Sequence, residues 1–395
     1  MQDTITNKPS IFSVVPAIAY EGISKQVLLQ MQALHELGYS IKLIVLTTVD
    51  DIALAEFAPG ITRSKITELR QPDAYLSVQA LRSAYGESRK IKQLLCEEKY
   101  AVVFAHAPYA HFLLRLAMLI GLRKNRGIKL WQYFHITQYL EFPLVTLRRK
   151  LLNNLNKWLA KRFDNGHVFV SDAVKADIQQ HLVRLPNSIV IYNALPSQSN
   201  PTKYNATLKT VSGKFKILLP GRVEASKGQI WFLEPFCEFI RVNGLSPDQV
   251  ELVIAGTGSQ FAELKKAVER KGLQDYVQLP GKLANEKLTE SMLQSSLVVV
   301  PSFIEGLPLV VLEALQQHSL VLASDIQPNR EVICNDKVGM LFKAGDKADC
   351  VAKLQHVYKY KSDNLIDDKS IDALLTTKFS FERHIREITT LIEKG

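Results

Sequence analysis

Short apolar runs alternate with helically spaced apolar positions along the first half of the chain. Residues 11–15 form an apolar run, a loop carries Gly22, residues 23–37 place apolar side chains at helical intervals, and residues 40–46 form a second run. Gly38 follows the helical stretch, as is typical of a helix end, because glycine adopts the left-handed conformation without strain. Strand, glycine loop, helix and strand in this order predict the βαβ unit of a parallel sheet.

The alternation continues to the end of the chain as two series separated by a linker. Residues 196–213 are rich in Ser, Pro, Asn, Thr and Lys and poor in apolar residues, which predicts the linker. The second series begins with a strand at 216–219, a glycine loop at 220–228 and a helix from Gln229. The other predicted strands are 101–105, 129–134, 167–170 and 189–192 before the linker, and 251–255, 277–279, 297–300, 320–323 and 339–342 after it.

This repetition predicts two α/β domains. The length of 395 residues agrees, because a single domain usually has roughly 100–200 residues. We expect an N-terminal domain over 1–195, the linker over 196–213 and a C-terminal domain over 214–378. The last segment, 379–395, contains an amphipathic stretch at 379–393, and this final helix is expected to cross back to the first domain.

Positive charge concentrates in the first predicted domain. The net charge is +10, and residues 1–195 contain 24 Lys and Arg against 15 Asp and Glu, whereas the rest contains 25 against 24. Between residues 115 and 162, eleven basic residues occur with a single acid, Glu141. Such an excess favours an anionic partner, which is a membrane surface, a nucleic acid or a phosphate-bearing substrate, although a plain solvated surface has the same composition.

The most basic segment also has helical periodicity. Residues 144–163 combine six Lys and Arg with apolar side chains at helical spacing. Such a helix either lies on an anionic membrane or packs on the sheet with its basic face in solvent, and both arrangements produce the same pattern. Its apolar positions are Leu147, Leu151, Leu155, Trp158 and Leu159.

Composition and targeting features indicate a globular protein of a reducing cytoplasm. Hydrophobic residues make up 47% of the chain, enough to form sizeable cores. Residues 1–10 lack the basic-then-apolar order of a secretory signal, and the most apolar run, 111–122, is shorter than the roughly 20 residues that span a bilayer. The four cysteines are scattered without a CxxC pair, which indicates neither a disulfide framework nor a zinc site.

The densest chemical signal lies in residues 298–315, VVVPSFIEGLPLVVLEAL. A strand ends at Pro301, a loop carries Glu305 and Gly306, and Pro308 suits the first position of a helix. Ligands of open α/β sheets bind beyond the carboxyl ends of the strands, so this loop predicts a binding site. The helix start offers backbone N–H donors, and Glu313, among apolar residues, needs a partner such as a sugar diol or a lysine.

Two glycine loops follow other strands of the second domain. Residues 221–228 include Arg222, which can grip a phosphate with two N–H groups, and Lys227, which adds a mobile positive charge. Gly256 and Gly258 follow the strand at 251–255, where a short glycine loop either lines a phosphate site or makes a tight turn.

Together these segments resemble the family 4 glycosyltransferases of the GT-B fold. The resemblance rests on Glu305 and Glu313, on Arg222 and Lys227 with the glycines beside them, and on the sequence PS..EGLPLVVLEA. Further matches lie at 22–24, 170–175, 191–194 and 324–331. The resemblance implies an α/β protein with two Rossmann-like domains whose parallel sheets face each other across a cleft.

The resemblance also implies a role for each matching residue. Arg222 and Lys227 would hold the donor's diphosphate and stabilise the charge that develops on it. Glu305 would orient the donor sugar, Glu313 would accept the ribose hydroxyls, and His135, after the strand at 129–134, would contact the sugar near the reaction centre. The other implied donor-binding residues are Gly22, Gly221, Gly256, Gly258, Gly281, Lys282, Leu283, Gly306 and Leu307.

The activity implied by the resemblance is that of a retaining hexosyltransferase. It would move a sugar from a nucleoside-diphosphate sugar to a glycan or lipid-linked acceptor in bacterial surface polysaccharide or lipopolysaccharide synthesis. No cofactor and no metal ion are implied, because Arg222 and Lys227 supply positive charge and no DxD sequence is placed to hold a metal. The alternative function is a non-catalytic nucleotide-sugar-binding subunit, which the intact set of four charged residues disfavours.

A nucleic acid is not expected, since the chain has no recognisable nucleic-acid-binding motif. The expected location is the cytoplasm, with peripheral contact at the inner face of the cytoplasmic membrane as an alternative. His106 also follows a predicted strand, and packing, capping and a place in the acceptor cleft all remain open for it.

Overall fold

The chain forms two compact units. The computed structural model describes residues 8–69, 78–121, 127–197, 213–360 and 365–394. The first unit comprises Met1–Asn193 with Phe381–Gly395, and the second comprises Ala194–Ser380. The boundaries expected at 195 and 379 lie two residues from these, and most of the expected linker at 196–213 falls outside the described residues.

A parallel sheet forms the centre of the first unit. In its described part, seven strands follow the order β3-β2-β1-β4-β5-β6-β7. The chain therefore proceeds outward from β1 in one direction and then resumes from β4 in the other, so the order reverses between β1 and β4. The strands are β1 (Ser10–Val15), β2 (Ile41–Val45), β3 (Ile66–Glu68), β4 (Ala101–His106), β5 (Ile128–Phe134), β6 (Gly166–Phe169) and β7 (Ser188–Val190).

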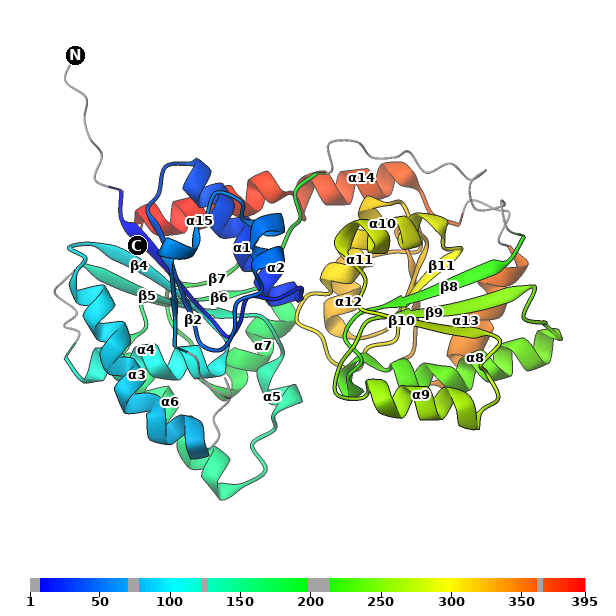
Figure 1. The fold of residues 1–395 in the computed structure, drawn as a ribbon, viewed down its shortest axis with the longest axis horizontal. Coiled ribbons are helices and arrows are strands. Elements are labelled where there is room, and N and C mark those ends of the chain that lie inside the picture. Colours follow the sequence, from blue (N-terminus) through cyan, green and yellow to red (C-terminus); the bar gives the residue numbers. More distant parts are fainter. Residues whose placement is uncertain (1–7, 70–77, 122–126, 198–212, 361–364, 395) are drawn as a thin grey trace, which may run out of the picture. The chain divides into compact units, whose positions relative to one another are not determined.

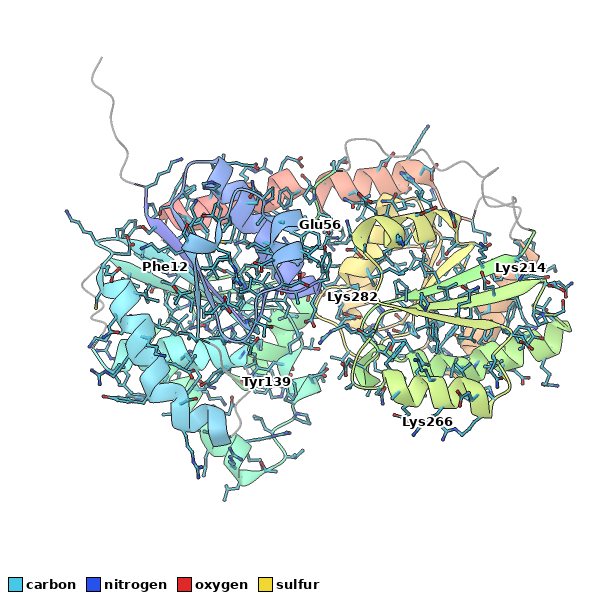
Figure 2. The ribbon with its side chains drawn as sticks, viewed as in Figure 1. Phe12, Glu56, Tyr139, Lys214, Lys266 and Lys282 are labelled. Atoms are coloured by element: carbon cyan, nitrogen blue, oxygen red, sulfur yellow. The ribbon has the colours of Figure 1, made fainter. Side chains whose placement is uncertain are left out.

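Helices cover both faces of this sheet (Figure 1). α1, α2 and α15 lie together on one face, and α3, α4 and α6 lie together on the other. The side chains of Phe12, Val103 and Leu113 are fully buried in the core between the sheet and the α3–α4 layer, and Phe12 is labelled in Figure 2. The helices are α1 (Gly22–Glu36), α2 (Asp51–Phe57), α3 (Val78–Cys96), α4 (Pro108–Leu119), α5 (Gln138–Glu141), α6 (Leu147–Phe163), α7 (Asp172–His181) and α15 (Phe381–Lys394).

The second unit repeats this organisation. Six described strands form a parallel sheet in the order β10-β9-β8-β11-β12-β13, and this order reverses between β8 and β11. The strands are β8 (Phe215–Pro220), β9 (Val250–Ala255), β10 (Val277–Gly281), β11 (Leu297–Val300), β12 (Val321–Ser324) and β13 (Met340–Phe342). The helices are α8 (Gln229–Asn243), α9 (Phe261–Arg270), α10 (Asn285–Gln294), α11 (Leu309–Gln316), α12 (Gln327–Val332), α13 (Lys347–Lys359) and α14 (Asp368–Thr377).

The final helix, α15, packs in the first unit against α1. Its buried His384 donates from Nδ1 to the carbonyl oxygen of Tyr192 at 2.8 Å. The other ring nitrogen of His384 lies 3.2 Å from Nε2 of Gln26 on α1. The chain thus returns to its first unit after completing the second, and a buried polar contact fixes the returning helix.

The strand positions expected from apolar runs are confirmed. All four side chains of β11 are buried, as in a central parallel strand covered by helices on both faces. β3 was not predicted, because its sequence, ITE, is short and only half-buried. Among the described helices, none combines the length and the apolar character that crossing a bilayer requires.

Candidate functional site

Four loops meet at the carboxyl edge of the second sheet. They follow β10, β9, β8 and β11, which are neighbours in that order. All of the predicted site residues except Gly22 and His135 belong to this unit; they lie on these loops, at the end of β10 (Gly281) or on α11 directly after the loops. The loops after β8 and β11 flank the point where the strand order reverses, which is where open α/β sheets bind ligands.

The structure joins Lys227 and Glu305 across that point. Lys227 ends a short 3₁₀ turn, Ala225–Lys227, and its Nζ lies 2.7 Å from Oε1 of Glu305 in the loop after β11. The hydroxyl of Ser302 donates to the same carboxylate oxygen at 2.8 Å. The Glu305 side chain is 8% exposed and the Lys227 side chain 24%, so a cation is held beside a buried carboxylate and still reaches solvent.

Backbone contacts fix this pair, and some of them involve residues to which the sequence analysis gave no role, namely Ser226, Phe303 and Ile304. The carbonyl oxygen of Ser226 accepts from the N–H groups of Phe303 at 2.7 Å and Ile304 at 3.2 Å. Gly228 adopts φ +73°, and a Cβ there would lie 2.2 Å from the carbonyl oxygen of Pro301. Only glycine permits this approach, so Gly228 brings the two loops together. No local sequence pattern predicts these contacts, because they join residues that are far apart in the chain.

The glycines Gly221 and Gly256 have a packing role in addition to the donor contact expected for them. A Cβ on Gly256 would lie 1.9 Å from the carbonyl oxygen of Gly221, so the loops after β8 and β9 approach through glycine. Gly221 N–H donates to Ala255 at 2.9 Å, and Gly256 N–H donates to Gly281 at 2.8 Å. The three loops therefore form one hydrogen-bonded layer.

Arg222 and Lys282 are exposed on this edge of the sheet. Nε2 of Gln229, at the start of α8, donates to the carbonyl oxygen of Arg222 at 2.8 Å and anchors the backbone of that residue. Lys282 directly follows β10, whereas Lys214 directly precedes β8, and Figure 2 shows the two at opposite sides of the second unit. Leu283, next to Lys282, is half-buried.

The start of α11 differs by one residue from the prediction. The helix begins at Leu309 with Pro308 as its N-cap, so the expectation that Pro308 takes the first helical position is wrong. Gly306 and Leu307 are buried in the loop before the cap rather than in the first turn. Glu313 is half-buried in the second turn of α11, between buried Leu312 and Ala314.

Gly22 and His135 belong to the first unit. Gly22 is the exposed first residue of α1. His135 directly follows β5, is 8% exposed, and its Nε2 lies 2.7 Å from Nδ1 of buried His106. The ring of Tyr133 stacks on His135 with centroids 4.7 Å apart. His106 is fully buried, so among the roles left open for it the structure favours packing, and its hydrogen bond to His135 is an addition to those roles.

Burial keeps this histidine pair neutral. It lowers the pKa of His135 to about 3, with a smaller contribution from the positive charge that His384 would carry. Burial likewise lowers the pKa of His106 well below its ordinary value, and the charge of His135 would add to that. In a neutral pair one ring donates and the other accepts, so each histidine fixes the tautomer of the other.

Buried neutral histidines predict a loss of stability in mild acid. Burial lowers the pKa of both His111 and His135 to about 3, and that of His384 to about 4. The unfolded chain binds these protons first, so the free energy of unfolding should fall as pH decreases below about 6.5, by up to about 1.4 kcal/mol per pH unit for each histidine.

Denaturant unfolding at pH 7 and pH 5 measures this loss, and His111→Gln is the variant for comparison. Nε2 of His111 donates to the carbonyl oxygens of Ala105 at 3.0 Å and Tyr133 at 3.1 Å, and a glutamine amide offers a donor that does not titrate. We expect a smaller pH dependence in the variant. An equal pH dependence in both proteins would contradict the assignment.

Two family models match the chain, one over each half. The model described as Glycosyltransferase Family 4 matches residues 20–198, and the model described as Glycosyl transferases group 1 matches residues 202–367. Together the two matches extend over most of the chain.

Curated relatives and solved structures agree with these matches. The alpha-D-kanosaminyltransferase of Streptomyces kanamyceticus is 29% identical over 35% of this chain and 36% of that protein. The UDP-Gal:alpha-D-GlcNAc-diphosphoundecaprenol alpha-1,3-galactosyltransferase of Escherichia coli is 23% identical over 87% of this chain and 84% of that protein. The chain spans about half or less of the length of several curated relatives that it matches.

The fold matches that of Anabaena HepE in complex with UDP and glucose, with a TM-score of 0.79 at 16% identity. The match covers 98% of this chain and 100% of that one. Both units, each with a Rossmann-like parallel sheet, are thus those of the GT-B fold, as predicted.

Proposed function

This chain belongs to the family 4 glycosyltransferases, and we propose on that premise that it is a retaining hexosyltransferase. Its donor would be a nucleoside-diphosphate sugar, and its acceptor a glycan or a lipid-linked glycan of bacterial surface polysaccharide or lipopolysaccharide synthesis. The names of two relatives support this class of reaction, since one is a kanosaminyltransferase and the other a galactosyltransferase for a diphosphoundecaprenol-linked sugar.

The Lys227–Glu305 ion pair carries the proposal. Its two residues lie on the loops that flank the reversal of strand order, and 2.7 Å separates the ammonium nitrogen from the carboxylate oxygen. Lys227 on one loop and exposed Arg222 on the same loop offer two cations for a diphosphate, while the buried carboxylate of Glu305 offers an acceptor for sugar hydroxyls. A sugar diphosphate matches both features, because its phosphates can pair with the cations and its sugar hydroxyls can donate to the carboxylate.

The proposed reaction breaks the bond between the anomeric carbon and the diphosphate oxygen. The acceptor oxygen bonds to the same face of that carbon, and its proton passes to the departing diphosphate. Negative charge grows on the diphosphate as the bond breaks, so Arg222 and Lys227 stabilise the transition state more than the bound donor. Glu305, held by Ser302 and Lys227, orients the donor sugar and forms no covalent bond.

We further propose a contact between the donor sugar and His135, which is neutral and has its tautomer fixed by His106. No metal ion is required, because the two cations take the part that a divalent ion plays in other transferases. The location we propose is the cytoplasm, peripheral to the inner face of the cytoplasmic membrane, where a lipid-linked acceptor is presented.

A donor panel tests this function. We expect titration calorimetry to detect binding of either UDP or GDP, and we expect the matching nucleoside-diphosphate sugars to release nucleotide in the presence of an acceptor extract, with the anomeric configuration kept. Turnover should be unchanged in EDTA, and its abolition by chelation would contradict the metal-independent mechanism. Nucleotide binding without turnover of any donor would instead indicate the non-catalytic binding subunit.

A further inference from the structure

Helix α6 exposes a set of large apolar side chains to solvent, while its buried side includes a polar residue, Asn153, beside Leu159 and Ala160. Four large apolar residues on its outer side are 43% to 73% exposed. At about 3.6 residues per turn they fall within roughly a quarter of the helix circumference and form one stripe, which we call the α6 ridge. The ridge consists of Leu147, Leu151, Leu155 and Trp158.

The inward side of α6 explains why the leucines point outward. Asn153 accepts from the hydroxyl of Tyr139, labelled in Figure 2, at 2.6 Å and donates to the carbonyl oxygen of His181 at 2.9 Å. Asn156 accepts from Nη1 of buried Arg115 at 3.1 Å. These partners hold the asparagines inward, while α6 packs beside α4 on the outside of the unit (Figure 1). Of the apolar positions predicted for this helix, only Leu159 packs inside.

Positive charge surrounds the ridge. By helical geometry, Arg148 lies along one edge of the ridge, Lys150 and Lys161 lie along the other, and Arg162 continues its line at the C-terminal end; all four are exposed. No acidic residue occurs between Glu141 and Asp164. Arg115, which the sequence grouped with this basic segment, is buried beneath the helix and is not part of the surface.

We propose that the α6 ridge docks the first unit on an anionic lipid bilayer. The leucines and Trp158 would enter the headgroup region, where indole rings are favoured, and the flanking Lys and Arg would contact lipid phosphates. A nucleic acid would pair with the cations but leave four exposed apolar side chains without a partner. A second copy of this chain would place two acid-free basic surfaces against each other.

This inference deepens the proposed peripheral location, and it is tested without any sugar transfer. The full chain is sedimented with vesicles of phosphatidylcholine alone, or of phosphatidylcholine with an equal amount of phosphatidylglycerol. We expect binding to the anionic vesicles only, with strong weakening between about 0.1 M and about 1 M NaCl, because added salt shortens the range of charge attraction. Equal recovery in the supernatant with both vesicles at low salt would overturn the proposal.

Two double variants separate the contributions of the ridge. Leu151→Ser with Leu155→Ser removes apolar contacts, and we expect the partition coefficient to fall by about tenfold or more. Lys150→Gln with Lys161→Gln removes two charges, and we expect a fall of about 25-fold, about fivefold for each. The control is Ile52→Ser with Val242→Ser, which alters two exposed apolar residues elsewhere and should bind as the unmodified protein does.

Nucleotide titration and sedimentation velocity complete the test. Each variant should bind the same nucleotide with unchanged affinity, since α6 lies in a different unit from the predicted donor loops. Vesicle binding retained in both ridge variants would overturn the docking surface, and a dimer that dissociates in the ridge variants would assign the ridge to a second copy instead. Loss of donor turnover with intact vesicle binding would contradict only the proposed function.

Discussion

Replacing Lys227 with alanine is expected to lower kcat for sugar transfer by about a hundredfold to a thousandfold. The Lys227 ammonium lies 2.7 Å from the Glu305 carboxylate, on one of the two loops that flank the reversal of strand order. Its attraction to the diphosphate increases as the bond to the sugar breaks. The loss in kcat should therefore exceed the loss in donor affinity, as measured by initial rates and calorimetry.

A second ion pair in the same unit supplies the matched control. Lys271 pairs with Glu234 on the surface, so Lys271→Ala removes the same charge away from the predicted site. We expect this variant to retain full activity, and both variants to show the circular dichroism of the unmodified protein. Unchanged turnover in Lys227→Ala would remove Lys227 from the diphosphate site. Equal losses in the two variants would show an effect of net charge alone.

Replacing Asp164 with asparagine should lower the free energy of unfolding by about 3–5 kcal/mol, because it leaves the guanidinium of Arg115 buried without a counter-charge. Nη2 of Arg115 lies 2.7 Å from the carboxylate, and the two side chains are 2% and 0% exposed. Gln132 donates to this carboxylate at 2.9 Å, and Nε2 of His167 lies 3.0 Å from it. Burial alone would raise the pKa of Asp164, but the charge of Arg115 and the hydrogen bonds from His167 and Arg115 outweigh it and lower the pKa to about 2.

Scanning calorimetry measures this loss as a fall in melting temperature. About 2–4 °C is expected per kcal/mol for a unit of this size, so the transition of the first unit should move down by roughly 6–20 °C. The control is Asp325→Asn, which breaks an exposed Asp–Arg pair with Arg330 and should cost about 1 kcal/mol or less. A shift in Asp164→Asn no larger than in the control would contradict the importance of the buried network. Because the pKa of Asp164 is low, its contribution to the free energy of unfolding is lost only as pH falls from about 4 to about 2.

The sequence predicted the loops that carry the candidate site residues, but it did not predict which of those side chains meet. Local sequence placed Lys227 in a loop after one strand and Glu305 in a loop after another, because a strand's apolar run and the glycine after it are neighbours in sequence. That the two side chains meet depends on β8 and β11 lying side by side. The sequence marked Gly228 as the glycine beside Lys227, but it did not predict that Gly228 fits against the Pro301 carbonyl, because that contact joins residues distant in the chain.

The sequence by itself determined the α/β class, the repeated strand and helix order and the loops that carry the charged residues, because each depends on the spacing of apolar side chains within a few residues. Tertiary structure decided which polar groups are buried and where each helix turns its faces. The apolar periodicity of α6 is visible in the sequence, yet its leucines face outward because Arg115, Tyr139 and the His181 carbonyl draw its asparagines inward. Periodicity in the sequence shows that a helix has an apolar stripe. Whether that stripe faces the core or the solvent depends on residues that come near the helix only in the folded chain.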